Sequence, residues 1–569
     1  MKNKILISLV VVLLLSFFLQ SVFKDNANIA SDHGYSAIVV NASGDEEKIS
    51  LIDINEDKVD SGEETSTKIV SSGEDFITPH STTLSDIQNF NMKYQIKYES
   101  GETSYLSYID MIGTDNYSDV KGITTFRGNN YRDSASYGTA NVVENKLEKI
   151  WTNTIGKIDG WGGVGWNGQP SIITWDDDVK MQMNIYDKFK QKENFTEVIY
   201  GALDSYIHFF DLETGERTRD KIKIPSCIKG SVTIDPRGYP LLYVGQGIDT
   251  NNGKAVKMGY FIFSLIDGKE LCFINGRDKF AYIGWGAFDG NPVIDSKTDT
   301  MFLPGENGVI YIVKLNTNFD KTNGTIKIDP KITRYRYTIN GRAAGTENAM
   351  TIYKNYAFFI NNHGYLQCLD LKTLTPVWLH FMEDDCDATL GLEEENGKIM
   401  LYASSEVDRR RQKAPAYIRK IDGTTGEKVW EYTIECNYDV NVNGGFLSSP
   451  IVGKNDISDL VIFNAAKTGK TFNSGKIVAL SKDTGALVWE KDLTIYSWSS
   501  PTAIYNKDGK GYVIFCDAYG KIHLIDARTG ETLYVLATGG GNMEGSPAIY
   551  NDIIVIGTRG QKIYGIKIK

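Results

Sequence analysis

A short strand-like phrase recurs eight times along the 569-residue chain, and this repeat constrains the fold more than any other feature. Its copies begin at Tyr206, Tyr260, Val309, Tyr365, Tyr417, Lys476, Lys521 and Lys562. Successive copies start roughly 40 to 60 residues apart, which is the length of a unit of four short strands. A unit repeated at this period predicts one supersecondary element that is stacked many times.

Each full copy continues into a tight turn and a further strand that ends in an aromatic residue. The glycine of this turn is Gly215, Gly426, Gly485 or Gly530 in four of the copies. Such a turn requires a positive φ, which glycine adopts at little cost. We expect the aromatic residue, for example Trp430 or Trp489, to pack between neighbouring units. In one copy Leu374 replaces the glycine, so we expect a different turn there.

A proline stands upstream of the phrase in several units. These prolines are Pro170, Pro292, Pro450, Pro501 and Pro547. Proline has no backbone N–H, so it tolerates only the start or the edge of a strand. Each unit therefore reads as an inner strand, a middle strand, the recurring strand and the aromatic-ended strand. The sequence predicts an all-β fold, an eight-bladed β-propeller of four-stranded antiparallel blades.

The two ends of the repeat region predict how the ring closes. The last copy, Lys562–Lys569, lacks the aromatic-ended strand, and a matching phrase stands at the other end as Leu147–Trp151. We expect this N-terminal strand to complete the C-terminal blade, because closure removes free sheet edges. The propeller is assigned to residues 120–569.

The N-terminal part predicts export and a spacer. Lys2 and Lys4 precede an apolar run from Ile5 to Phe23, which is near the length that spans a bilayer. We expect residues 1–23 to be a signal-anchor that holds the propeller outside the cell membrane, with a cleaved signal peptide and secretion as the alternative. Residues 24–119 are rich in acidic and small polar residues and predict an acidic flexible stalk.

Composition excludes some function classes. The formal net charge of −11 argues against binding to nucleic acid, which needs clustered basic surface. The six cysteines show no spacing typical of a disulfide framework or a zinc site, and their redox state stays open. We expect the ring to be monomeric.

The repeats resemble a known family. Ala479–Trp489 resembles the Ala-x-Asp-x-x-x-Gly-x-x-x-Trp motif of pyrroloquinoline-quinone-type (PQQ-like) β-propeller repeats. The lead-in Phe126–Arg132 also resembles that family, and the resemblance covers roughly Gly122 to Lys569. It implies either a dehydrogenase that uses PQQ and calcium, or a non-catalytic propeller such as the barrel-assembly propeller lipoprotein of outer membranes.

The chain departs from the enzymes of that family. They often carry an adjacent Cys-Cys pair over the cofactor, whereas no two cysteines are adjacent here, and no Cys-x-x-Cys-His haem motif is present. Ser481 replaces the aspartate of the repeat motif, but that aspartate has a structural role. These departures favour the non-catalytic members.

Loops that join an outer strand to the next inner strand gather around the channel on one face of a propeller. The candidate ligand-face residues on these loops are Trp161, Trp166, Arg277, Trp285, Arg342, Asn443, Trp498, Asn542 and Glu544. They suit a sugar, a planar cofactor or a partner peptide, although tryptophans that only cap the inner strands are the alternative. Asp384, Asp385 and Asp387 are candidate calcium ligands, with an exposed turn as the alternative.

The sequence shows no recognisable set of catalytic acid, base and cofactor-binding residues. We therefore assign no catalytic residue, and the sequence favours a protein that is not an enzyme. We expect a cell-envelope propeller that acts as a binding or docking scaffold, with an envelope protein or a glycan as partner and no cofactor. A quinone- and calcium-dependent dehydrogenase and a carbohydrate-binding propeller are the alternatives.

Overall fold

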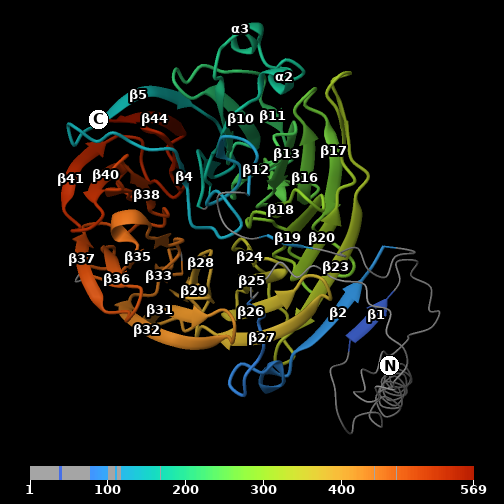
Figure 1. Cartoon of the computed structure of the whole chain (residues 1–569), viewed down its shortest axis with the longest axis vertical. Coiled ribbons are helices and arrows are strands. Elements are labelled where there is room, and N and C mark those ends of the chain that lie inside the picture. The colour runs from blue at the N-terminus through green and yellow to red at the C-terminus, as the bar shows by residue number, and fades with distance from the viewer. Residues whose placement is uncertain are drawn as a thin grey trace, which may run out of the picture.

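The computed structural model describes residues 37–40, 77–99, 109–111, 117–166, 168–440, 442–469 and 471–569. Eight of its β-sheets are arranged as blades around a central axis, so the predicted eight-bladed, all-β propeller is confirmed (Figure 1). The helices of the described residues are short: α2 (Asp177–Lys180), α3 (Asp187–Lys190), η1 (Ile87–Phe90) and η2 (Asn455–Ile457).

The first four blades follow one another along the chain, each from an inner to an outer strand. Blade 1 consists of β8 (Ser171–Thr174), β9 (Thr196–Gly201), β10 (Tyr206–Asp211) and β11 (Ile222–Lys223). Blade 2 consists of β12 (Val232–Ile234), β13 (Leu241–Gly245), β16 (Gly259–Ser264) and β17 (Glu270–Asn275). Blade 3 consists of β18 (Val293–Asp295), β19 (Thr300–Pro304), β20 (Val309–Lys314) and β23 (Lys331–Thr338). Blade 4 consists of β24 (Thr351–Tyr353), β25 (Tyr356–Ile360), β26 (Tyr365–Asp370) and β27 (Thr375–Phe381).

The other four blades complete the ring. Blade 5 consists of β28 (Gly391–Glu395), β29 (Lys398–Ser404), β31 (Ala414–Asp422) and β32 (Glu427–Cys436). Blade 6 consists of β34 (Ile451–Val452), β35 (Leu460–Ala466), β36 (Gly475–Ser481) and β37 (Leu487–Leu493), with β30 (Glu406–Val407) and β33 (Gly444–Gly445) beside them. Blade 7 consists of β38 (Thr502–Tyr505), β39 (Gly511–Cys516), β40 (Lys521–Asp526) and β41 (Thr532–Ala537). Blade 8 consists of β42 (Ala548–Tyr550), β43 (Ile553–Thr558), β44 (Lys562–Ile568) and β5 (Leu147–Thr154).

The last blade takes its outer strand from the N-terminal side of the repeats. β5 pairs antiparallel with β44, with Gly565 opposite Trp151 and Ile566 opposite Lys149. Ile150 stands at the register shift between these two pairs. Figure 1 shows the two strands side by side, β5 in cyan and β44 in red.

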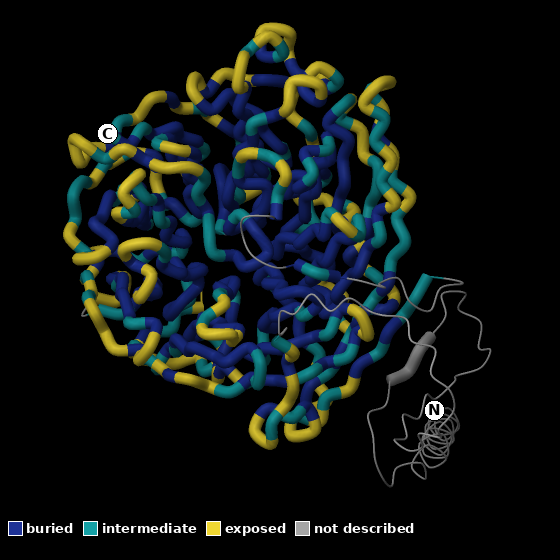
Figure 2. The backbone as a smooth tube through the Cα atoms, in the orientation of Figure 1, coloured by how far each residue is buried: buried dark blue, intermediate teal, exposed yellow. Residues whose placement is uncertain are grey.

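Further short elements extend the four-stranded blades or lie beside them. They are β1 (Ala37–Val40), β2 (Lys93–Lys97), β3 (Gly122–Ile123), β4 (Ser136–Tyr137), and the hairpins β6–β7 (Lys157–Ile158, Trp161–Gly162), β14–β15 (Thr250–Asn251, Lys254–Ala255) and β21–β22 (Asn318–Asp320, Thr325–Lys327). Burial is nearly complete in the inner and middle strands, and exposed residues lie mainly on turns and outer strands (Figure 2).

The repeat motif joins neighbouring blades through its glycine and its tryptophan. The indole N–H of Trp430, on the outer strand of blade 5, donates to the carbonyl of Lys482 in blade 6 at 2.7 Å. A Cβ on Gly485, three residues after that lysine, would lie 2.7 Å from the same indole. The same arrangement recurs for Trp151 with Gly215, Trp378 with Gly426 and Trp489 with Gly530. The expected packing of the aromatic between units is therefore observed, and the glycine is needed for space as well as for φ.

The lead-in, residues 117–140, lies in the centre of the ring. It hydrogen-bonds in every blade to a residue of the inner strand or to the residue immediately before that strand. These partners are Thr174, Ile234, Pro292, Ile352, Leu392, Pro450, Tyr505 and Ile549, in blades 1 to 8 in turn. Its short strands also pair with the ring, β3 antiparallel with β8 and β4 parallel with β42.

Two buried arginines anchor the lead-in to the prolines that open the inner strands. Arg132 donates to the carbonyl of Pro292 at 3.1 Å, and Arg127 donates to that of Pro501 at 2.7 Å and also to Pro450. Burial lowers the pKa of both guanidinium groups to about 10, so both remain charged at neutral pH. A charge this deeply buried is tolerated because backbone carbonyls surround it.

Part of the segment predicted as a stalk is built into blade 3. β2 pairs antiparallel with the outer strand β23, and Tyr94 and Ile96 are buried against it. The rest of that segment, apart from the short described pieces, and the predicted signal-anchor 1–23 lie outside the described residues. Among the residues that the structure describes, no helix is both long and apolar enough to cross a membrane.

The contact between glycine and tryptophan generates a matched test. Gly485→Ala forces a Cβ against Trp430 at a φ of +72°, whereas Gly397→Ala has the same φ of +72° and open space around its Cβ. We expect both variants to lose about 1 kcal/mol of unfolding free energy for the backbone conformation. Only Gly485→Ala should lose roughly 1 to 3 kcal/mol more from the overpacked blade interface, as measured by urea unfolding. Equal losses in the two variants would contradict the role assigned to the tryptophan.

Candidate functional site on the axial loop face

In several blades a residue just before the inner strand fixes the loops around the channel. Backbone N–H groups at this position donate to the side chain at the same position of the next blade, as from Ser449 to Ser500 (3.0 Å) and from Ser500 to Ser546 (3.1 Å). The N–H of Gln169 donates likewise to Ser231 at 2.8 Å. These bonds hold the loops that precede the inner strands side by side around the axis.

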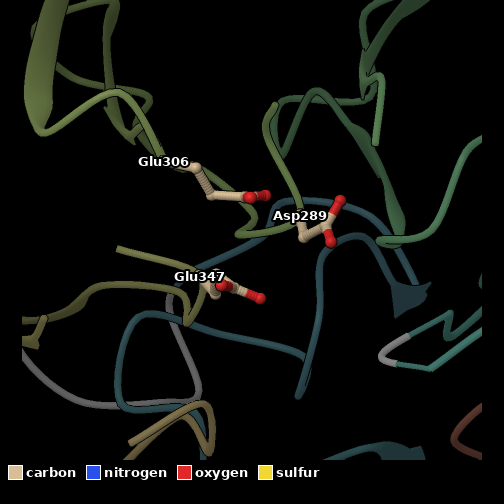
Figure 3. A group of neighbouring side chains, drawn as sticks. All are labelled: Asp289, Glu306 and Glu347. Carbon is tan, nitrogen blue, oxygen red and sulfur yellow. The ribbon is translucent and has the colours of Figure 1, made fainter. Parts of the chain in front are cut away.

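Three carboxylates from neighbouring loops converge on this face. Asp289 lies between β17 and β18, Glu306 in the turn between β19 and β20, and Glu347 between β23 and β24. One carboxylate oxygen from each residue lies within 4.8 Å of one oxygen of each of the other two. Figure 3 shows the three side chains, here called the first acidic cluster, pointing into a common space.

Lysine and tryptophan side chains contact the first acidic cluster. Lys229 lies 3.3 Å from Asp289, and Glu306 accepts from the indole N–H of Trp285 at 2.8 Å. The other oxygen of Glu306 is buried, and no hydrogen-bond partner for it is found among the described residues. Burial raises the pKa of Glu306 well above its ordinary value, and Asp289 and Glu347 raise it further. Burial and the charge of Asp289 also raise the pKa of Glu347.

Asp385, Asp387 and Glu406 form a second acidic cluster, again with one oxygen from each residue within 4.8 Å of the others. Glu406 is fully buried and accepts from the backbone N–H of Asp387 (3.0 Å) and from the side chain of Asn443 (2.9 Å). Burial raises its pKa to about 8. The charge of Glu347 contributes to the raised pKa of all three carboxyls, so the two clusters act on each other.

The structure thus brings together two of the three predicted calcium ligands. Asp385 and Asp387 meet Glu406, whereas Asp384 stands apart from the cluster. One oxygen of Asp384 accepts from the backbone N–H groups of Asp385 and Arg409, both at 2.8 Å. Asp384 therefore shapes the loop.

The predicted tryptophans lie around the same channel mouth. The indole of Trp498 donates to the carbonyl of Asn443 (3.3 Å), and that of Trp166 donates across the ring to the carbonyl of Leu447 (3.3 Å). Trp285 bonds to Glu306 and keeps 39% of its surface exposed. All three indole N–H groups therefore have protein partners, and Trp285 retains a face for contact with a ligand.

Further predicted residues complete this circle of contacts. Trp161 lies under Lys229 and Arg559, whose cationic groups are 5.8 and 5.3 Å from its ring. Arg559 pairs with Glu544 at 3.0 Å, and Glu544 accepts from Asn542 at 2.9 Å.

Two predicted residues play no part in these contacts. Arg277 pairs with Asp249 at 2.6 Å and is half exposed. Arg342 is an exposed residue of the loop between β23 and β24.

Sequence reasoning missed Asp289, Glu306, Glu347, Glu406 and Lys229. A signal for part of this set was present, because an acid stands four residues before the first residue of the inner strand in several units. These acids are Asp289, Glu347, Asp387 and Glu544. Glu306 comes from the turn between β19 and β20, and Glu406 from β30 in the connection between β29 and β31, where no repeated position marks them.

The donor sets suit one of the two groups that the fold implies. Carboxylate oxygens at this spacing match a hard divalent cation such as Ca²⁺. With Lys229 charged, the three carboxylates of the first cluster retain excess negative charge for such an ion. A pyrroloquinoline quinone carries carboxylates of its own, which the acidic clusters would repel unless a cation lay between them.

Comparisons with known proteins agree with the fold. Residues 414–569 match the family model described as outer membrane protein assembly factor BamB. The quinohemoprotein alcohol dehydrogenase of Comamonas testosteroni is similar at 13% identity and a TM-score of 0.52, with 80% of this chain and 82% of that chain covered. The dehydrogenase ADHIIG of Pseudomonas putida HK5 is similar at 11% identity and a TM-score of 0.53, with 81% and 82% covered.

BamB of Moraxella catarrhalis is also similar, at 14% identity and a TM-score of 0.44, with 74% of this chain and 98% of that chain covered. No curated protein sequence matches the chain. The family match and the eight blades confirm the resemblance to the PQQ-like propeller family. At these identities the solved structures show the fold alone.

The raised pKa of Glu406 predicts a pH-dependent stability. Because its pKa is about 8 in the folded protein and near 4.5 in the unfolded chain, the folded state binds more protons between these values. The free energy of unfolding should therefore fall by roughly 2 to 4 kcal/mol as pH rises from about 4.5 to 8. Urea unfolding in the presence of a chelator measures this slope. Glu406→Gln should flatten it, and the exposed control Glu531→Gln should not; identical slopes in both variants would refute the assignment.

Proposed function

We propose that this PQQ-like propeller is a docking scaffold of the cell envelope that performs no redox chemistry of its own and receives its partner on the axial loop face. The observation that carries the proposal is the circle of contacts around the channel mouth, with two acidic clusters at its centre. Predicted and newly found side chains there already have protein partners that fix their geometry. Such a preorganised polar surface suits binding.

A bound divalent cation is part of this proposal. Five of the clustered carboxyls have raised pKa values because burial and mutual repulsion disfavour their ionised forms. A divalent cation would displace protons from them and set the charge of the face that a partner meets. Calcium in this role stabilises the docking surface and takes part in no reaction.

The place in the envelope rests on the N-terminal sequence. The charged and then apolar residues 1–23 support export with a single N-terminal anchor, which leaves the propeller outside the cell membrane. The match of the C-terminal repeats to the BamB family model supports a role in protein binding at the envelope.

Terbium luminescence tests the cation. Trp285 bonds to Glu306, so an ion held by the first cluster would lie within range of energy transfer from that indole. We expect saturable luminescence that calcium abolishes by competition. Glu347→Gln and Asp289→Asn should weaken terbium binding by about tenfold or more, because each removes a charged oxygen ligand. The exposed control Glu531→Gln should bind like the parent protein, and parental affinity in the cluster variants would refute the site.

Site-specific crosslinking tests docking. A photo-crosslinking residue replaces Trp285 on the axial face or Val535 on β41, two positions with matched exposure of 39% and 42%. In intact cells, only the probe at 285 should capture an envelope protein, and Glu347→Gln should reduce that capture. Equal capture from both positions would exclude docking on this face. A quinone absorbance band that co-elutes with protein after addition of quinone and calcium would favour the dehydrogenase instead.

A further inference from the structure

A second polar pocket lies at the rim of blade 1 and shares no residue with the acidic clusters. Its volume is about 250 Å³. It is enclosed by β6, by the turn between β9 and β10, by the segment from Arg217 to Lys223, and by the tip of the β14–β15 hairpin at Asn251 and Asn252. The amide of Asn251 donates to the carbonyl of Pro225 at 2.7 Å, which holds the hairpin against the pocket. We call this feature the rim pocket.

The rim pocket is strongly basic in a chain of net negative charge. Its four cationic lining residues are Lys157, Arg217, Lys221 and Lys223. All four are exposed, and within the described part of the chain none of them forms an ion pair with a carboxylate. The ammonium groups of Lys221 and Lys223 lie 3.4 and 5.9 Å from the centre of the same ring, that of Tyr206. Like charges gathered this closely create a positive potential that attracts anions.

The one acid among the lining residues is already engaged. Asp204 is buried and accepts from the backbone N–H of Gly156 (2.8 Å) and from that of Tyr206 (3.2 Å). The Nε2 atom of His208 lies 3.1 Å from both of its oxygens. Asp204 is therefore committed to the floor of the pocket and leaves the four cations unneutralised.

This floor also orients the arginine. His208 is buried, and its Nε2 faces the carboxylate of Asp204, so that nitrogen donates to it. A guanidinium nitrogen of Arg217 lies 3.5 Å from Nδ1, and the guanidinium stacks 5.5 Å from the ring of Phe210. Asp204 and His208 thus act as positioning residues that hold the fork of Arg217 at the pocket.

We propose that the rim pocket binds a phosphate group. A planar guanidinium donates two parallel hydrogen bonds to phosphate oxygens, and lysines add point charges around them. A dianion relieves the mutual repulsion of four cations more than a carboxylate or a neutral sugar does. The group can belong to a free phosphate, to a polyol-phosphate polymer of the envelope or to a phospholipid headgroup. The inference does not depend on the proposed function of the axial face.

Calorimetry with inorganic phosphate, on the full chain at low ionic strength and without divalent cations, tests the proposal. We expect saturable binding that weakens as salt is added. The double variant Arg217→Gln/Lys221→Gln should lose affinity by at least about tenfold, because it removes the fork and one point charge. Lys507→Gln, an exposed lysine between β38 and β39, is the matched control and should bind like the parent protein.

Two further measurements keep the outcome decisive. Arg217→Lys keeps the charge but not the fork, so it should bind with an affinity between those of the parent and the double variant. All altered side chains are exposed, so unchanged melting temperatures will show that the fold is intact. Absence of saturable phosphate binding, or equal affinity in the double variant and in Lys507→Gln, would overturn the proposal.

The source of the phosphate is distinguished by two ligands. Glycerol-phosphate oligomers that bind more tightly than inorganic phosphate, with the same dependence on Arg217 and Lys221, would identify an envelope polymer. Retention on vesicles of phosphatidylglycerol in phosphatidylcholine above that on phosphatidylcholine alone, lost in the double variant, would identify a lipid headgroup. Either result supports phosphate recognition by the rim pocket.

Discussion

The hydrogen bonds between the lead-in and the inner strands hold the whole architecture together. Eight blades leave an axial space that inner-strand side chains alone do not fill, and residues 117–140 occupy it while bonding to every blade. Arg127 and Arg132 make these bonds charge-assisted, which compensates for their own desolvation. The prolines before the inner strands also take part in these hydrogen bonds. They have no N–H to donate, but their carbonyls accept from the arginines of the lead-in. Because the axial space of the ring is filled, a ligand can bind only on the loop face or at the rim.

The position of the acids follows from this filling. Loops before the inner strands are fixed to one another by the bonds between successive blades, such as Ser449 to Ser500. Asp289, Glu347 and Asp387 stand directly upstream of that fixed position, so their carboxylates meet at the mouth with little freedom to separate. Burial and repulsion among these carboxylates raise the pKa values of Glu347 and Asp387. Protonation or a bound cation would relieve this repulsion. The same hydrogen bonds between blades therefore fix the loops of the ring and concentrate negative charge on its loop face.

The repeat itself was sufficient to predict the ring, because glycine and tryptophan act between blades and so recur at fixed spacing. The acids were harder to find, since Glu306 and Glu406 come from connections within blades that no repeat marks, and they meet the other acids only in space. Leu374 shows a different failure. It adopts a φ of +54°, and the turn keeps the left-handed conformation because Asp370 accepts from the backbone N–H of Lys372 at 2.9 Å. The expectation of a different turn was thus wrong in conformation: local side-chain bonding outweighed the intrinsic preference for glycine.

Within the predicted stalk, the alternation of Tyr94 and Ile96 was a strand signal that the surrounding acidic composition concealed.

The two charged surfaces of the ring are kept apart by one hairpin. Ile158 on β6 pairs with Trp161 on β7, so Lys157 lies at the basic rim pocket while Trp161 lies at the channel mouth beneath Lys229 and Arg559. Lys229 and Arg559 form ion pairs with Asp289 and Glu544, whereas the cations of the rim pocket have no carboxylate partner among the described residues. Opposite charges placed this way do not neutralise each other, and each surface keeps its own selectivity: cations are attracted to the mouth and anions to the rim. A net charge of −11 conceals this division, because it sums two surfaces whose chemistry is opposite.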